Sequence, residues 1–138
     1  MSGDRAWYLD ASAIVKLVVR EPESAALARS LRRRRTLVSS ALSRTEVGRA
    51  LAPHGQAALR RGRDVLSRID LVRISDRILD EAAVLQPQDL RSLDAIHLAT
   101  ARQLGAALAG VVIYDVRMAA AAEGLGWTAS APGAPTGS

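Results

Sequence analysis

The chain has 138 residues and a formal net charge of +5, with 49% hydrophobic and 24% charged residues and no cysteine. This length suits one globular domain, and the missing cysteines exclude disulfide scaffolds, thiolate zinc sites and cysteine nucleophiles. No apolar run approaches the roughly 18–20 residues of a membrane span, and the beginning of the chain has no signal-peptide pattern. We therefore expect a cytoplasmic protein without membrane contact, whose positive charge favours an anionic partner such as nucleic acid.

Short apolar runs alternate with helical patterns along the sequence. The runs cover residues 7–10, 36–40, 71–74 and 111–114, with a weaker one at 127–129. Brief, nearly continuous apolar runs are typical of strands covered on both faces, and their alternation with helices predicts parallel β-α-β units. We therefore predict an α/β fold with a single domain over residues 1–129 and a disordered, Pro- and Gly-rich tail over residues 130–138.

The helical patterns carry start signals. Pro22 is placed for a first helical turn, and Asp76 is a good N-cap residue. Ser43 is followed three residues later by Glu46, which completes a capping-box pattern. Helices are expected from Pro22 to the run of four arginines, and over residues 43–52, 57–68, 76–85, 92–104 and 116–123.

Four acidic residues occupy places where α/β folds bind ligands. Asp10 closes the first strand and Asp115 closes the fourth. Glu46 lies early in the helix after the second strand, and Asp94 lies in the first turn of the helix over residues 92–104. Because ligands bind at the carboxyl ends of parallel strands, we expect all four to converge on one edge of the sheet.

Each of these acidic residues also has a simpler explanation. Asp94 and Glu46 could be helix charges favoured by the dipole, and Asp10 and Asp115 could cap the helices that follow them. Capping explains each residue singly but not their shared placement. Carboxylates gathered without cations repel one another, so the cluster implies bound metal. All-oxygen donors suit Mg²⁺ or Mn²⁺, the ions of many phosphoryl-transfer sites.

Four segments carry the acidic residues: residues 9–17 (LDASAIVKL), 44–47 (RTEV), 93–101 (LDAIHLATA) and 114–118 (YDVRM). Together they resemble the PIN-domain family, and in particular the VapC toxins of type II toxin–antitoxin pairs. The first and third are the specific ones, and the likeness runs in order over nearly the whole chain.

The resemblance implies a three-layer α/β/α sandwich with a central, mainly parallel sheet of four to five strands. It also implies a Mg²⁺- or Mn²⁺-dependent endoribonuclease in which Asp10, Glu46, Asp94 and Asp115 match the family's acidic quartet. Asp10 and Asp94 are expected to bind the metal, with Glu46 and Asp115 acting through water or a second ion. Ser12 matches the small hydroxyl residue that supports the first acid.

The same resemblance implies partners: an RNA substrate, a VapB-like antitoxin that blocks the site, a homodimer, and operator DNA contacted only through the antitoxin. One position departs from the family. Many relatives carry Thr or Ser two residues before the fourth acid, where this chain has Ile113. Asp115 is therefore the least secure of the four as a ligand.

The remaining polar features have two interpretations each. His97 could be a general base, but its place on the apolar face of its helix favours a packed, hydrogen-bonded side chain, and His54 in a Pro-His-Gly break is expected to be exposed. Arginine side chains could follow RNA phosphates, or could simply be solvated. The RNA-binding candidates are Arg32, Arg33, Arg34, Arg35, Arg60 and Arg61.

Two rivals to the ribonuclease hypothesis remain at this point. A PIN-like protein that binds RNA or an antitoxin without cutting would agree with the loss of a hydroxyl at Ile113. A structure-specific DNA nuclease on the same fold is the other rival, although the chain lacks the length for the extra arch or helical insert that such enzymes tend to need.

Overall fold

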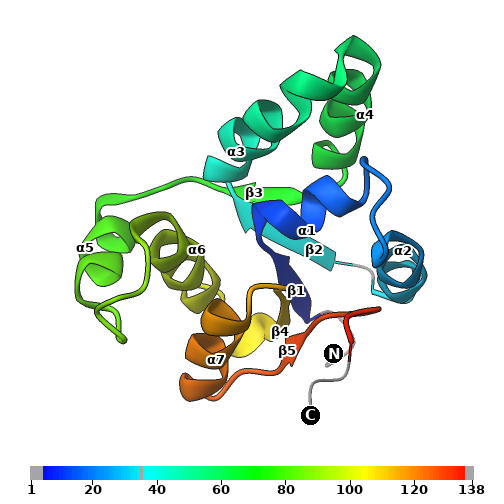
Figure 1. The fold of residues 1–138 in the computed structure, drawn as a ribbon. Helices are drawn as coiled ribbons and strands as arrows, with labels where there is room; N and C mark the ends of the chain where they lie inside the picture. The colour runs from blue at the N-terminus through cyan, green and yellow to red at the C-terminus, as the bar shows by residue number, and fades with distance from the viewer. Residues whose placement is uncertain (1–4, 35, 136–138) are drawn as a thin grey trace.

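The computed structural model describes residues 5–34 and 36–135, in which strands and helices alternate along the chain (Figure 1). The strands are β1 (Ala6–Leu9), β2 (Thr36–Ser40), β3 (Asp70–Val72), β4 (Leu108–Val112) and β5 (Ala129–Ser130). The α-helices are α1 (Ala11–Lys16), α2 (Ser24–Arg32), α3 (Leu42–Leu51), α4 (Gln56–Leu66), α5 (Asp76–Val84), α6 (Ser92–Arg102) and α7 (Val116–Gly124). Short 3₁₀ helices are η2 (Ala52–His54) and η3 (Gly105–Ala107).

The five strands form one parallel sheet in the order β3-β2-β1-β4-β5. The chain begins in the middle of the sheet at β1, builds outward through β2 and β3, and then crosses back to β4 and β5. This reversal makes the space beyond the carboxyl ends of β1 and β4 a topological switch point, where α/β proteins bind their ligands. Asp10 and Asp115 both follow these two strands.

The core has two halves because strand residues alternate between the faces of the sheet. Ala6 and Tyr8 of β1 face a cluster with α6 and α7, whereas Leu9 faces a cluster with α1, α2, α3 and α4. Figure 1 shows these two groups of helices on opposite sides of the sheet. The predicted three-layer α/β/α fold is thus confirmed, with all five strands parallel.

Some predicted boundaries are wrong. The predicted strands at residues 71–74 and 111–114 lie at Asp70–Val72 and Leu108–Val112 instead. Helix α3 begins at Leu42 and has no side-chain cap, because Ala41 is at the N-cap position; Ser43 lies inside the helix, with its buried hydroxyl 2.7 Å from the Ser39 hydroxyl. Helix α5 is capped by Ser75, which accepts a hydrogen bond from the Ile78 N–H, and Asp76 is its first residue.

The C-terminal segment contacts the domain over part of its length. Ser130 pairs with Val112 in the sheet, and the Tyr114 hydroxyl donates to the Pro132 carbonyl at 2.8 Å. Residues 136–138 lie outside the described part of the chain, so the predicted disorder of the tail stays a prediction for them.

Among residues 5–34 and 36–135, no helix is both long and apolar enough to cross a membrane.

Candidate active site

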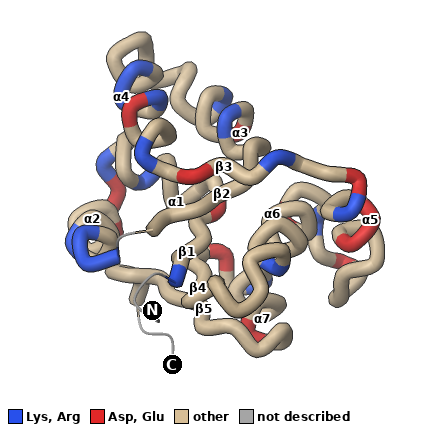
Figure 2. Tube along the Cα trace, turned by 180° about the vertical axis from the view of Figure 1, so that it is seen from behind, with Lys and Arg blue, Asp and Glu red and all other residues tan. Residues whose placement is uncertain are grey.

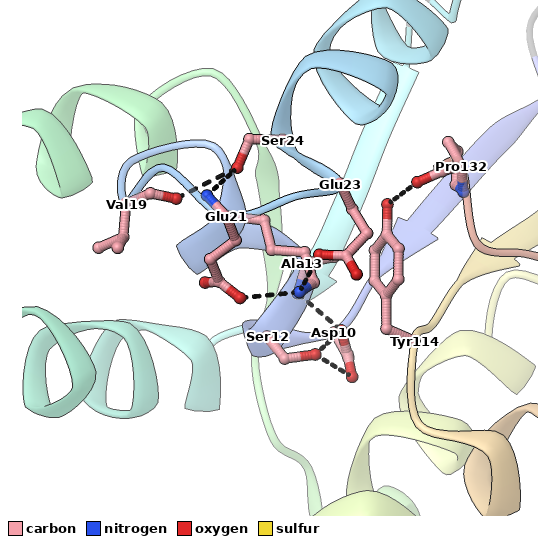
Figure 3. Close-up of polar contacts among 10 residues, drawn as sticks. Asp10, Ser12, Ala13, Val19, Glu21, Glu23, Ser24, Tyr114 and Pro132 are labelled. Atoms are coloured by element: carbon pink, nitrogen blue, oxygen red, sulfur yellow. Dashed lines mark hydrogen bonds and ion pairs between the residues drawn. The ribbon is translucent and has the colours of Figure 1, made fainter. Parts of the chain in front are cut away.

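Asp10 lies at the carboxyl end of β1 and is the N-cap of α1. Its Oδ1 accepts the Ala13 N–H at 3.0 Å, and the Ser12 hydroxyl lies 3.0 Å from each carboxylate oxygen (Figure 3). The residue is only 6% exposed. Burial raises the pKa of the Asp10 carboxyl, and the Ala13 N–H, His97 and Ser12 oppose this rise. The capping interpretation is therefore confirmed for Asp10. Capping alone does not explain the burial of its carboxylate, because a capping side chain can remain exposed to solvent.

Glu46 is connected through His97 to the core of the sheet. His97 is 2% exposed, and its Nε2 lies 2.6 Å from Glu46 Oε1 while its Nδ1 lies 2.7 Å from the Tyr8 hydroxyl. His97 thus joins the Glu46 carboxylate to the Tyr8 phenol, with one ring nitrogen on each. Burial raises the pKa of Tyr8, so its hydroxyl keeps its proton. The packed, hydrogen-bonded His97 expected from the sequence is confirmed.

Asp94 and Asp115 lie on the more open side of the site and share one cation. Arg91 is the residue before α6. Its Nε–H donates to Asp94 Oδ2 at 3.2 Å, and its Nη2 donates to Asp115 Oδ2 at 3.5 Å. Asp115 also caps α7, since its Oδ1 accepts the Met118 N–H at 2.9 Å. These carboxylates line an open cleft of about 240 Å³, bordered by Asp89, Leu90, Arg91, Asp94, Asp115 and Arg117.

The structure brings the four predicted acids to the same edge of the sheet but not into one tight cage. The charge of Asp94 contributes to the raised pKa of Asp10, so these two carboxylates influence each other. In residues 5–34 and 36–135, however, no three Asp, Glu or His side chains lie close enough together to hold a metal ion. Three of the four carboxylates are instead engaged by His97 or Arg91.

A network around Lys16 borders the Asp10 side of the site. The Lys16 amine donates to Glu21 at 2.9 Å and to Glu23 at 3.1 Å, and it lies 4.7 Å from the centre of the Tyr114 ring. Figure 3 shows these glutamates and Tyr114 grouped beside Asp10. The network ties the α1–α2 connection to the segment after β4.

The predicted RNA-binding arginines lie elsewhere. Residues 32–34 precede β2, and because all strands are parallel they lie at the amino edge of the sheet, opposite the acidic residues. Arg34 is partly buried over the Trp7 ring, at 3.7 Å from its centre, and Arg35 lies outside the described residues. Arg60 and Arg61 are exposed on α4, and arginine gathers on α2 and α4 (Figure 2). None of these described side chains lines the cleft beside Asp94 and Asp115.

His54 and Ile113 are the remaining positions that the sequence singled out, and the weaker role of Asp115 beside Ile113 stays a prediction. His54 is exposed, as predicted. Ile113 is 1% exposed within the apolar cluster that contains Leu98 and Met118, so its side chain contributes to the core.

Arg91 and Tyr8 are the site residues that sequence reasoning missed. Arg91 stands three residues before Asp94, a spacing at which side chains on neighbouring turns meet, and this was the available signal. The sequence signal for Tyr8 was weaker: Tyr8 precedes Asp10 by two residues, so the two side chains lie on the same side of the extended segment.

Residues 7–124 match the model of the PIN domain. Ribonuclease VapC46 of Mycobacterium tuberculosis is 56% identical over 125 residues, which cover 91% of this chain and 96% of the relative. The chain belongs to the PIN-domain family and, within it, to the VapC ribonuclease toxins.

Other VapC proteins agree with this assignment. Ribonuclease VapC35 of M. tuberculosis is 44% identical, over 91% of this chain and 96% of the relative. The crystal structure of M. tuberculosis VapC20, described as a sarcin–ricin-loop-cleaving toxin, superposes with a TM-score of 0.71 at 13% identity and covers 88% of this chain and 96% of that one. A toxin–antitoxin complex from Klebsiella pneumoniae gives a TM-score of 0.63 at 20% identity, over 80% and 87% of the two chains. At these identities the two structures support the fold alone.

Proposed function

We propose that this VapC protein is a Mg²⁺- or Mn²⁺-dependent endoribonuclease whose site is formed by Asp10, Glu46, Asp94 and Asp115. The observation that carries the proposal is the buried carboxylate of Asp10 at the switch point of the sheet, with Asp94 close enough to raise its pKa. Burying a carboxylate is costly unless a cation or hydrogen bonds compensate it, and a divalent cation is the strongest such compensation.

The donor set fits a hard cation. All four candidate ligands are carboxylates, the preferred ligands of Mg²⁺ and Mn²⁺, and the Arg91 guanidinium already occupies a cation's position between two of them. When bound, a divalent ion lowers the pKa of a water molecule and neutralises charge that develops on the phosphate. We assign Asp10 and Asp94 as the main ligands, with Glu46 and Asp115 acting directly or through water.

The protein's own part is to hold these side chains in place. Ser12 and the Ala13 N–H fix both oxygens of Asp10, which leaves the carboxylate a single orientation. His97 engages one oxygen of Glu46 and leaves the other for water or a cation. Such preorganisation lowers the reorganisation cost when substrate binds.

Replacement of single carboxylates tests the proposal. Asp10→Asn and Asp94→Asn should each reduce cleavage of total RNA in Mg²⁺ by more than about a hundredfold, because even residues that only support metal ligands change activity by about 10–100-fold. Asp80→Asn, at an exposed position on α5, is the matched control and should cleave normally. New RNA 5′ ends are counted by sequencing, and circular dichroism checks that each variant is folded.

Two outcomes would contradict the proposal. Full cleavage by folded Asp10→Asn or Asp94→Asn protein, or by the natural chain in EDTA, would remove the metal mechanism. Tight RNA binding without new ends under any divalent ion would favour the non-cutting RNA-binding alternative.

We also propose an antitoxin as protein partner, as the Klebsiella complex suggests for a protein of this fold. An open cleft of about 500 Å³ between α3 and α4 suits an amphipathic segment of that partner. The half-buried Leu59, Leu66 and Leu71 provide its apolar lining, and Arg44 and Arg63 border it, so the segment should carry acidic residues. Copurification of the neighbouring open reading frame's product with this chain checks the pairing.

The homodimer, the antitoxin-mediated contact with operator DNA and the cytoplasmic location stay predictions.

A further inference from the structure

We propose that Arg91 is an exchangeable cation of the site. Its guanidinium contacts the carboxylates of Asp94 and Asp115 when no divalent ion is bound, and it binds a phosphate of the RNA when a divalent ion has taken its place. The inference rests on the proposed function and adds to it a residue that links metal binding to RNA binding. It begins from the place of Arg91 between carboxylates that come from two different helices.

The contacts of Arg91 are of a kind that another cation can replace. Its side chain is 76% exposed, and the two N–O distances of 3.2 and 3.5 Å are longer than those of a strong charge-assisted hydrogen bond. Exposed ion pairs of this type contribute little net free energy. A divalent ion with twice the charge and a smaller radius would therefore displace the guanidinium from both carboxylates.

The contacts of Arg91 also explain how Asp94 and Asp115 can lie near each other. Asp115 is held at one oxygen by the Met118 N–H and at the other by Arg91, and Asp94 turns an oxygen to the same guanidinium. With Arg91 between them, two carboxylates can remain neighbours without a metal ion. This agrees with the absence of a three-ligand group among the residues that the structure describes.

Once displaced, Arg91 stays at the edge of the cleft, because its backbone is the N-cap position of α6. Arg117 lies on the same cleft and pairs with Asp89 at 2.6 Å. A planar guanidinium presents a fork of N–H donors that matches phosphate oxygens. Arg91 is thus placed to bind a backbone phosphate beside the carboxylates only after these have been neutralised.

Mn²⁺ binding without RNA tests the first half of the proposal. Arg91→Gln should bind Mn²⁺ about fivefold more tightly than the natural chain, as expected when the two weak, exposed ion pairs of Arg91 no longer compete. Arg117→Gln removes the same charge from the same cleft but leaves both carboxylate contacts of Arg91 in place, so its effect should be clearly smaller. Isothermal titration calorimetry or the electron paramagnetic resonance signal of free Mn²⁺ measures both constants.

The salt dependence of RNA binding tests the second half. For single-stranded RNA, loss of one phosphate contact lowers the slope of log K against log [salt] by about 0.7. Arg91→Gln should show this decrease in saturating Mn²⁺ and no decrease in EDTA, as measured by fluorescence anisotropy with a labelled RNA at low temperature. Arg91→Lys keeps the charge but not the fork, so it should retain the salt slope while binding Mn²⁺ more tightly than the natural chain.

The outcomes separate this proposal from the one on which it rests. If the natural chain binds no Mn²⁺, the metal-dependent function fails. If it binds Mn²⁺ but Arg91→Gln and Arg117→Gln have equal affinities, or if the salt slope of Arg91→Gln is unchanged in Mn²⁺, the exchange by Arg91 is wrong and the proposed function stands.

Discussion

The four carboxylates of the site fall into an inner pair, Asp10 and Glu46, and an outer pair, Asp94 and Asp115. The inner pair is held by groups of the fold itself: a backbone N–H, the Ser12 hydroxyl and the imidazole of His97. The outer pair shares the exposed guanidinium of Arg91, although Asp115 also accepts the Met118 N–H. The inner half of the site is thus fixed by folding, whereas the arrangement of the outer half depends more on which cation is present.

The largest stability effect should come from the support of the inner pair. Tyr8→Phe removes the hydroxyl that contacts His97 Nδ1 and leaves a buried nitrogen without this partner. We expect a loss of about 1–3 kcal/mol, seen as a fall in Tm of about 4–10 °C. Tyr114→Phe is the matched control, because its hydroxyl also makes one hydrogen bond but is less buried. Equal losses in the two variants would show that the inner pair has no special support.

A smaller effect follows from the pH dependence of Asp10. Burial raises the pKa of Asp10 in the folded chain above its ordinary value of 3.8, so the folded state binds this proton more tightly than the unfolded state. Ionisation of the Asp10 carboxyl therefore lowers the free energy of unfolding progressively as the pH rises from about 4 through the folded-state pKa.

Asp10→Asn carries no such charge. In EDTA its Tm should exceed that of the natural chain by a few degrees at pH 7, and the difference should shrink toward pH 4. Mn²⁺ should raise the Tm of the natural chain more than that of the variant. A thermal melt series over pH 4–8 measures both trends; a difference that does not change with pH would contradict the buried charge.

The smallest effect should be found at the outer edge of the cleft. Arg117→Gln breaks the exposed ion pair with Asp89, in which both side chains are about 70% exposed. We expect its Tm to change by less than about 2 °C. A larger fall would mean that ion pairs of the outer half contribute to the fold, which would weaken the contrast between the two halves.

Much of the fold and the placement of the four acids could be predicted from the sequence. Asp10 and Asp115 follow apolar runs directly, and the carboxyl ends of parallel strands must share an edge, so the strand pattern alone brings these two together. Helix charges such as Asp94 could be placed for the same reason, since α6 begins at that edge.

Side-chain pairing was harder to predict, because it depends on how each helix is rotated about its axis. The predicted Ser43 cap was wrong, since Ser43 lies inside α3 and its hydroxyl contacts that of Ser39 near the end of β2. The contact between Tyr8 and His97 joins residues that are 89 positions apart, and local periodicity carries no information about it. The position of Arg32 and Arg33, in contrast, had a signal that was overlooked: they precede a strand, and therefore lie at the amino edge of a parallel sheet.

Lys16 has a practical consequence for labelling the protein. It is the single lysine of the sequence, and its side chain is 12% exposed between two glutamates. Although burial lowers the pKa of this amine, the hydrogen bonds and charges of Glu21 and Glu23 raise it overall, so the reactive neutral form is scarce. The α-amino group titrates near pH 8. An amine-reactive fluorophore at neutral pH should therefore couple to the α-amino group and yield one dye per molecule without an introduced cysteine.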